Sequence, residues 1–272
     1  MVMLVINRRF IKLMMNDYTT LLQITDCHLQ EHADIPFKGF YPDARLDQVI
    51  AGIKNTRSKL EQPLYDHLLL TGDLAHDTAL SVYARILEKT KDLAQQRHWI
   101  PGNHDDLDLM TQFSEVQSNI IVANNWGVVL LNSTSNPNGI GSGSLSITEL
   151  DLLASSAHLE VEHLLVVLHH PPIDLGSRWQ DEIKLANADE FWRVLKTIKK
   201  VRAIVFGHVH QEHHVKINGI ELFATPATAP QFKKGQVTPV LEDNPEFALP
   251  AYREFKLFSD GCIETQVYRA NR

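Results

Sequence analysis

The chain is poor in cysteine and has no long hydrophobic run. Among its 272 residues there are two cysteines, Cys27 and Cys262, and no Cys-x-x-Cys pair. This scarcity excludes a disulfide framework and is typical of a reducing compartment, so we predict a cytoplasmic protein. No run approaches the ~20 apolar residues that a membrane-spanning helix needs. We therefore expect no membrane partner.

Runs of positive charge are also missing. The formal net charge is −7, and no Lys/Arg stretch is long enough to form a basic stripe. Nucleic acid and acidic membrane surfaces are thereby excluded as main partners. A local cationic site made by metal ions remains compatible with this charge, and whether the chain forms a homodimer is left open.

The N-terminal segment does not look like a targeting peptide. Its basic residues follow the apolar run at residues 1–6, and no small-residue cleavage site appears. We expect residues 1–17 to be a loose arm, or to precede a true start at Met14 or Met15. Residues 18–272 have ordinary globular composition, with 44% hydrophobic residues over the whole chain, and we predict one domain there.

What the sequence does contain is a repeated arrangement of short apolar runs that end in polar residues. Their Val, Ile and Leu content is typical of strands buried on both faces. The five runs lie at residues 21–25, 68–72, 99–102, 164–168 and 203–207. Between these runs, apolar residues recur at helical spacing, which predicts helices over residues 43–59, 78–95, 106–113, 148–155 and 188–199. Asp77 or Thr78 could cap the second of these helices.

The C-terminal part changes to hairpins. Residues 213–217 and 220–224 flank the turn signal Asn218-Gly219, and residues 253–258 pair with 262–268. Residues 132–146 are rich in Ser, Asn and Gly and predict a loop. The fold class we predict is α/β (α+β by some schemes): a four-layer-like β-sandwich of two mixed sheets flanked by helices.

Polar residues follow each of the five runs. If the carboxyl ends of these strands form one rim, they deliver two Asp, one Asn and several His to one place, the ligand set of a metal centre. On an extended chain, Asp26 and His28 would point to the same side and Cys27 to the other, which favours a packed role for Cys27. A single Asp-x-His or His-x-His is weak, but the five ends together are a strong signal.

Taken in order, these motifs resemble the calcineurin-like metallophosphoesterase superfamily over residues 19–225. The motifs are Asp26-x-His28, Gly72-Asp73, Gly102-Asn103-His104-Asp105, His169-His170-Pro171-Pro172 and Gly207-His208-Val209-His210. Residues 224–228 (Ala-Thr-Pro-Ala-Thr) and Gln231-Phe232-Lys233 further resemble the bacterial class III 3′,5′-cyclic AMP phosphodiesterases.

The resemblance implies a dinuclear metal centre. It assigns one ion to Asp26, His28, Asp73 and His210, and a second to Asp73, Asn103, His169 and His208, with Asp73 bridging. His170 is expected to be a neighbour, with a direct ligand role as the alternative. Iron and manganese are the first expectation, and zinc or cobalt also fits the oxygen and nitrogen ligands.

The same resemblance makes His104 the catalytic residue, which hydrogen-bonds a phosphate oxygen and stabilises or protonates the leaving alkoxide. The alternative is a histidine that only orients its neighbours. Substrate contacts are implied for His28, Asn103, His104 and His208. Asp105 is expected to cap the following helix. Residues 30–41 and 174–181, with Arg178 and Trp179, could wall the pocket or be solvated loops.

The resemblance implies an enzyme that hydrolyses 3′,5′-cyclic AMP to 5′-AMP, and we expect in-line attack by a metal-bridging hydroxide. The alternatives are another small phosphodiester or nucleotide, such as a glycerophosphodiester or a nucleotidase substrate, and a non-catalytic metal-binding scaffold. The phosphate-gripping Arg of Ser/Thr phosphatases is absent after Gly72-Asp73, which disfavours monoesters. Whether His76, Asp77 or neither supports His104 is left open.

Overall fold

The protein is seen here in a computed structural model that describes residues 17–58 and 60–270. The predicted N-terminal arm lies almost entirely outside the described residues, and the boundary at residue 18 stays a prediction. The first sheet has the strand order β11-β10-β1-β2-β3. Strands β1, β2 and β3 run parallel, and β10 is antiparallel to both β1 and β11. Their bounds are β1 Tyr18–Ile24, β2 Tyr65–Thr71, β3 Ala94–Ile100, β10 Ala251–Phe258 and β11 Ile263–Arg269.

The second sheet has the order β4-β5-β6-β7-β9-β8. Strands β5, β6, β7 and β9 are parallel, and the edge strands β4 and β8 are antiparallel to their neighbours. The bounds are β4 Ile120–Ala123, β5 Trp126–Leu130, β6 His163–Val167, β7 Val201–Phe206, β8 His213–Ile217 and β9 Ile220–Ala224. The hairpin expected around Asn218-Gly219 is confirmed.

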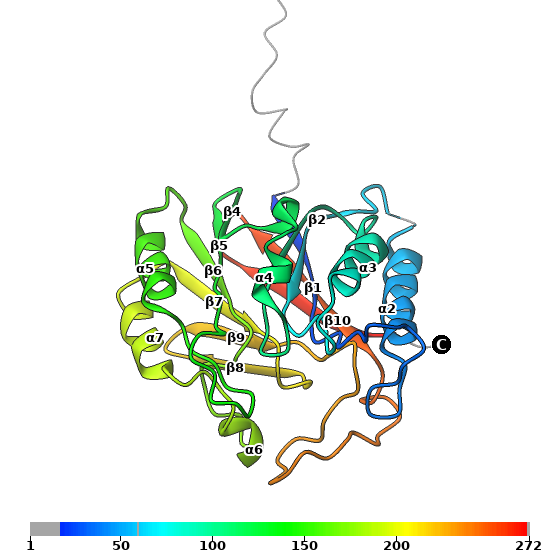
Figure 1. The fold of residues 1–272 in the computed structure, drawn as a ribbon. Coiled ribbons are helices and arrows are strands. Elements are labelled where there is room, and N and C mark those ends of the chain that lie inside the picture. Colours follow the sequence, from blue (N-terminus) through cyan, green and yellow to red (C-terminus); the bar gives the residue numbers. More distant parts are fainter. Residues whose placement is uncertain (1–16, 59, 271–272) are drawn as a thin grey trace, which may run out of the picture.

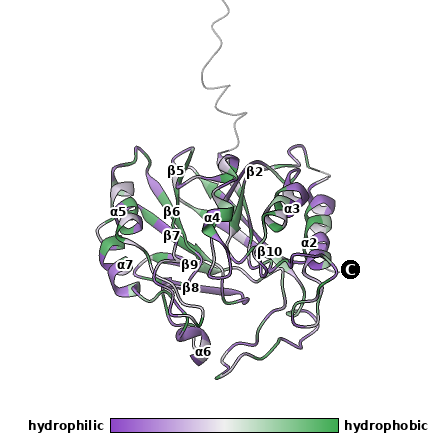
Figure 2. Cartoon of the chain, viewed as in Figure 1, coloured by the Kyte–Doolittle hydropathy of each residue, from purple (hydrophilic) through white to green (hydrophobic). Residues whose placement is uncertain are grey.

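Helices cover the outer faces of both sheets. Helices α2 (Pro42–Arg57) and α3 (Leu80–Thr90) pack on one side of the molecule, and α5 (Ile147–Ser155) and α7 (Ala188–Leu195) on the other (Figure 1). One apolar cluster lies under each helix layer, and a third, including Leu21, Leu69 and Val167, fills the space between the sheets. Hydrophobic and hydrophilic residues share each helix (Figure 2), as covering helices require. The predicted two-sheet sandwich with flanking helices is confirmed.

Several predicted element bounds were wrong. The helix expected over residues 78–95 ends at Thr90, because residues from Ala94 onward pair in parallel with β2. Its N-cap is Ala79, without a side-chain cap, so neither Asp77 nor Thr78 caps it. The helix expected to reach residue 199 ends at Leu195. Short helices complete the fold: α4 (Leu107–Met110), α6 (Arg178–Asp181) and the 3₁₀ turns Ser114–Val116 and Ser156–His158.

The five polar strand ends do not lie along one sheet. Strands β1, β2 and β3 belong to the first sheet, whereas β6 and β7 belong to the second. Their carboxyl ends meet across the sandwich, since the backbone N–H of His208 after β7 donates to Asp26 after β1. In the part of the chain that the structure describes, no helix is long and apolar enough to cross a membrane.

Candidate metal centre

The side chains expected to bind metal sit in tight turns at the strand ends. Five of them have φ between 47° and 71°, the left-handed region that non-glycine residues rarely adopt. Such conformations cost about 1–3 kcal/mol each and cluster at functional sites. The extended geometry assumed for Asp26 and His28 was therefore wrong, although Cys27 between them does pack in the apolar core. The five residues are Asp26, His28, Asp73, His208 and His210.

Glycines allow these turns to approach one another closely. A Cβ added to Gly102 would lie 2.2 Å from Oδ1 of Asp73 and 2.8 Å from Cε1 of His169. Gly72 has φ +92°, and a Cβ there would lie 2.4 Å from Nδ1 of His169. Neither position has room for a side chain, so these glycines keep the turns of β2 and β3 against the histidine after β6.

The first group of ligand atoms joins β1 to the turn after β7. Nε2 of His28 lies 3.1 Å from Nε2 of His210, which is 3.5 Å from Oδ1 of Asp26. Nδ1 of His210 donates to the carbonyl of Pro230 at 2.7 Å, which directs Nε2 toward His28 and Asp26. Oδ2 of Asp73 lies 3.5 Å from Nε2 of His28.

The second group joins β2, β3, β6 and β7. Oδ1 of Asp73 lies 3.5 Å from Nε2 of His169, and that nitrogen is 3.2 Å from Nδ1 of His208. Nδ1 of His169 donates to the carbonyl of Thr71 at 2.9 Å, which directs Nε2 into the group. Oδ1 of Asn103 is buried without a hydrogen-bond partner among the described residues.

His170 is held away from this role. Its Nδ1 lies 2.8 Å from the hydroxyl of Ser133, and its Nε2 lies 3.1 Å from the carbonyl of Gly141. Both ring nitrogens thus have protein partners, so no lone pair is directed at a cation. This geometry agrees with the expectation that His170 is a neighbour of the site.

Asp73 and the histidines around it influence one another's ionisation. Burial opposes ionisation of Asp73, but His169 and His28 outweigh it and hold the pKa of the carboxyl well below its usual range. Burial likewise opposes a charge on His169, yet Asp73 raises the pKa of that imidazole to about 9. Burial lowers the pKa of His28 and His208, and neutral imidazole is the form that binds metal.

The donor set therefore fits a pair of metal ions. Buried carboxylates, imidazoles and an unpartnered amide oxygen converge, and groups such as Asp26, His28 and His210, or Asp26, Asp73 and His169, have ligand atoms within 4.8 Å of one another. Oxygen and nitrogen donors in this mixture suit divalent transition metals.

His104 stands at the edge of this centre. Its backbone N–H donates to Oδ1 of Asp73 at 2.9 Å, and its ring centroid is 4.9 Å from that of His28. The His76 ring is also 4.9 Å away, and Asp77 is exposed. Among the described residues no hydrogen bond joins the His104 ring to His76 or Asp77, so neither supports it in that way.

Asp105 has a different place from the one expected. Asp106 caps α4, since its Oδ1 accepts from the backbone of Leu109 at 3.0 Å. Asp105 is half-buried, and desolvation together with Asp73 raises the pKa of its carboxyl to about 7. It ties the turns of β2 and β3 together by accepting from the backbone N–H groups of Leu74, Ala75 and Gly102. The sequence motif alone gave no signal for this role.

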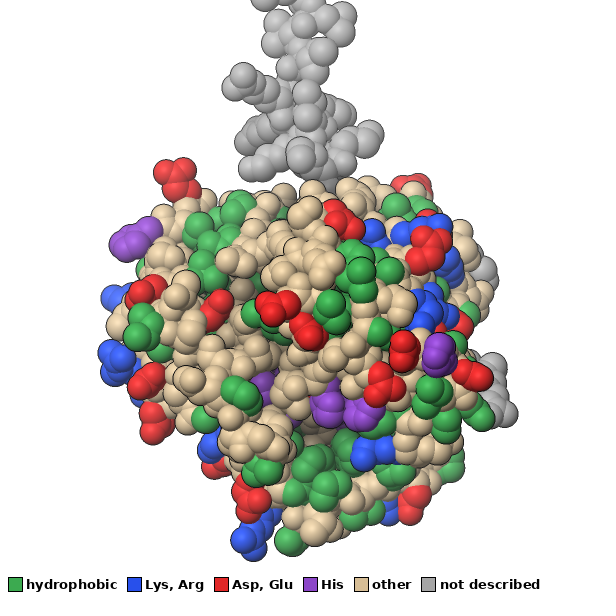
Figure 3. Space-filling model, in the orientation of Figure 1, with side chains coloured by type: hydrophobic (Ala, Val, Ile, Leu, Met, Phe, Trp, Pro, Cys, Tyr) green, Lys and Arg blue, Asp and Glu red, His purple; other side chains and the backbone are tan. Residues whose placement is uncertain are grey.

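Aromatic side chains border the centre. Phe37 stacks on His28 with ring centroids 4.8 Å apart, Phe232 lies 5.0 Å from His210, and Trp179 lies 5.0 Å from Phe232. Figure 3 shows histidines gathered in a hollow with hydrophobic side chains below them. From the two predicted wall segments, Phe37 contacts His28, and Trp179 contacts Phe232 beside the centre. Arg178 instead pairs with Glu182 on the surface.

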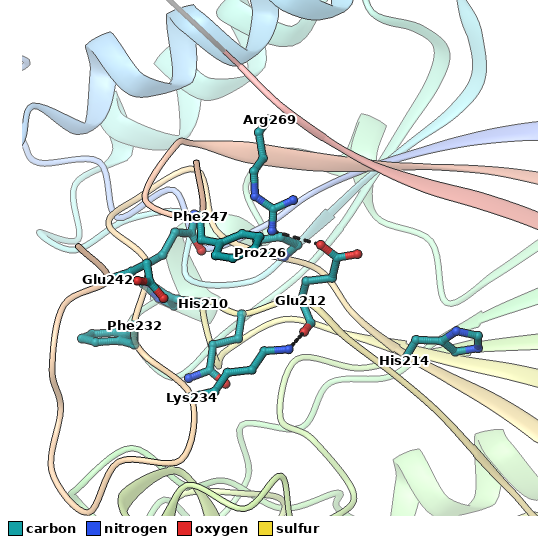
Figure 4. A pocket seen from close by; sticks show the side chains of 11 residues that line it. His210, Glu212, His214, Pro226, Phe232, Lys234, Glu242, Phe247 and Arg269 are labelled. Atoms are coloured by element: carbon teal, nitrogen blue, oxygen red, sulfur yellow. Dashed lines mark hydrogen bonds and ion pairs between the residues drawn. The ribbon is translucent and has the colours of Figure 1, made fainter. Parts of the chain in front are cut away.

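A cavity of about 490 Å³ lies beside the centre (Figure 4). His210 and Phe232 belong to both its lining and the border of the metal centre. Its other walls include Phe247 and the ion pair of Arg269 with Glu212, whose side chains are 3.0 Å apart. Sequence reasoning did not find this cavity, because its lining comes from the turn between β7 and β8, from β8 and β11, and from the segment between β9 and β10.

Comparison with known proteins agrees with this architecture. The family profile of calcineurin-like phosphoesterases matches residues 19–212. The chain belongs to this family. It is therefore a phosphoesterase, and the metallophosphoesterase family predicted from its motifs is confirmed.

Individual proteins similar to this chain include two bacterial enzymes and one solved structure. The chain is 36% identical to a Haemophilus influenzae protein named 3′,5′-cyclic adenosine monophosphate phosphodiesterase CpdA, over 92% of this chain and 89% of the relative. It is 33% identical to a Pseudomonas aeruginosa protein of the same name, over 92% and 90%. A dimetal phosphatase from Danio rerio shares the fold, with a TM-score of 0.59 at 12% identity, over 93% of this chain and 99% of that one.

Proposed function

We propose that the protein is a dinuclear metal-dependent phosphodiesterase that hydrolyses 3′,5′-cyclic AMP to 5′-AMP. The observation that carries this proposal is the position of Asp73, whose Oδ2 lies 3.5 Å from His28 and whose Oδ1 lies 3.5 Å from His169. A carboxylate with one oxygen toward each ligand group is suited to bridge two ions. The names of the relatives support cyclic AMP as the substrate.

The residues divide between two ion positions. Asp26, His28, Asp73 and His210 would hold the first ion, and Asp73, Asn103, His169 and His208 the second. Iron or manganese is our first expectation, and zinc or cobalt is compatible with the same donors. When bound, such ions supply positive charge for the phosphoryl oxygens and lower the pKa of water. The orphaned Oδ1 of Asn103 would gain a partner by this occupancy.

His104 would complete the reaction. In the hydrolysis, the oxygen of water forms a new bond to phosphorus, and the bond from phosphorus to the ribose 3′ oxygen breaks. The His104 imidazole, at the edge of the ligand groups, would give a proton to that leaving oxygen. His28, Asn103, His104 and His208 surround the place where the phosphate would bind.

The cytoplasm is the compartment that we propose. Both cysteines are free, and one of them, Cys262, is exposed on the surface. An exposed thiol without a partner is compatible with a reducing environment. The substrate itself is also a small anion, which needs no basic surface for binding.

A substrate panel tests the proposal. Protein loaded with Mn²⁺ is assayed on 3′,5′-cyclic AMP, other cyclic nucleotides, glycerophosphodiesters, nucleoside monophosphates and bis(p-nitrophenyl) phosphate, and kcat/KM is compared. We expect cyclic AMP to rank at or near the top. If it ranks among the poorest, the substrate assignment is wrong, and if no diester is hydrolysed with any metal, the chain is a binding scaffold.

A further inference from the structure

We propose that His76 and His104 form a third, inhibitory binding site for a transition-metal ion such as Zn²⁺, beside the two positions described above. The inhibitory part of this inference rests on the proposed function, because it requires His104 to act in catalysis. The binding part does not, since it follows from the arrangement of the side chains alone.

Three imidazoles gather at this point. His28, His76 and His104 each offer one ring nitrogen, and these atoms lie within 4.8 Å of one another. The ring centroids of His76 and His104 are 4.9 Å apart, and those of His28 and His76 are 5.7 Å apart. Since His28 is assigned to the first ion, His76 and His104 are the two rings left available for another.

The cluster contains ring nitrogens that lack partners. Nδ1 of His76 and Nδ1 of His28 are both buried, and neither has a hydrogen-bond partner among the described residues. A buried polar atom left unpaired costs about 1–3 kcal/mol. Phe37 covers one side of this cluster, with its ring centroid 4.6 Å from His76 and 4.8 Å from His28. Its apolar side chain has no oxygen or nitrogen atom that could hydrogen-bond to these nitrogens.

The other three-histidine group in the described chain shows the contrast. His169, His170 and His208 also have nitrogens within 4.8 Å of one another, but both nitrogens of His170 are taken by Ser133 and Gly141. That group offers no extra ligand beyond those of the second ion. His76 has no such partner for Nδ1, so its imidazole remains free to coordinate.

The coordination chemistry of Zn²⁺ suits the imidazoles of His76 and His104. It binds neutral imidazole at about 2.0–2.1 Å and accepts water in its remaining positions. Neutral imidazole is the form that binds metal. In the proposed site one ring nitrogen of His76 and one of His104, which lie within 4.8 Å of one another, would bind the same ion. A His104 nitrogen bound to zinc can no longer give a proton to a leaving oxygen, so excess zinc would inhibit.

Equilibrium dialysis tests the site. The full chain is dialysed against graded free Zn²⁺, and bound zinc is counted by atomic emission for the wild type, His76→Gln and His32→Gln. Gln keeps a polar side chain of similar size, and the exposed His32 is a matched control on the neighbouring loop. We expect His76→Gln to bind one zinc fewer than both other proteins. Equal stoichiometry in all three proteins would overturn the third site.

An inhibition assay tests the consequence. With Mn²⁺-loaded protein and a phosphodiester substrate, added Zn²⁺ should slow the wild type and His32→Gln, and at least tenfold more zinc should be needed for His76→Gln. Equal inhibition of all three proteins would contradict the inhibitory role. If no protein hydrolyses any diester, the proposed function fails, while the dialysis result still decides whether the site exists.

Discussion

The backbone N–H of His104 donates a hydrogen bond of 2.9 Å to Oδ1 of Asp73. One carboxylate oxygen thereby contacts both the turn that carries His104 and, at 3.5 Å, Nε2 of His169. The residue proposed to bridge the ions and the residue proposed to move the proton are thus joined through the main chain. Because the bond uses a backbone atom, the side chain of His104 can be removed without breaking it.

Asp73→Ala should remove bound metal from both positions, since one side chain serves both ligand groups. Metal content of the purified variant, measured by atomic emission, should fall from two ions to less than one per chain. Asp47→Ala is the matched control, because Asp47 is exposed and contacts Lys89 instead of the centre. Two tightly held ions in Asp73→Ala would contradict the bridging role.

His104→Ala should keep the metals and lose rate. The backbone bond to Asp73 survives, while the proton donor is lost, so kcat should fall on the order of 10²–10⁴-fold. Metal content and the thermal unfolding midpoint should stay close to those of the wild type. Turnover like that of the wild type would show that His104 only orients its neighbours.

Gly102→Ala should destabilise the protein and its centre. The new methyl group would lie 2.2 Å from Oδ1 and 2.3 Å from the backbone nitrogen of Asp73, so the turns must separate. We expect the free energy of unfolding to fall by roughly 1–3 kcal/mol together with weaker metal binding. The control Gly52→Ala lies in α2 with its nearest neighbour at 3.7 Å and should be neutral or stabilising. Equal stability of the two variants would refute this account.

Acid should weaken the fold through His67 and His98. The pair is buried, with Nδ1 of His67 3.1 Å from Nε2 of His98. Burial lowers the pKa of both rings, to about 4 for His98, where His67 adds to the effect. Both folded pKa values lie below the unfolded value, so this contribution is complete above pH ~6.5 and is lost as pH falls toward ~4.

Urea unfolding at pH 7.5 and pH 5 measures this loss. Between these two conditions, the wild type should lose on the order of 1 kcal/mol more than the double variant His67→Leu/His98→Leu. The comparison between proteins removes the effect of carboxylates that titrate in both. The same loss in both proteins would show that the histidine pair does not sense pH.

The types and order of the main elements were predictable because they depend on local patterns. Buried strands such as β6 are continuous apolar runs, and the Asn218-Gly219 turn marks its hairpin. The division of strands between sheets was less accessible, since pairing of residues distant in sequence decides it. Residues 94–95 illustrate this, because they lie in the predicted helix and pair with β2 in the structure.

Residue identities at the strand ends were by themselves enough to predict metal-ligand chemistry, because Asp, Asn and His rarely follow five separate apolar runs by chance. Tertiary structure decided how those side chains are used. It placed the five ends in two sheets, turned Asp26 and His28 into left-handed conformations, occupied both nitrogens of His170, and left Nδ1 of His76 unpaired. These outcomes depend on which backbone and side-chain groups meet across the sandwich, and that information is not present in any local stretch of the chain.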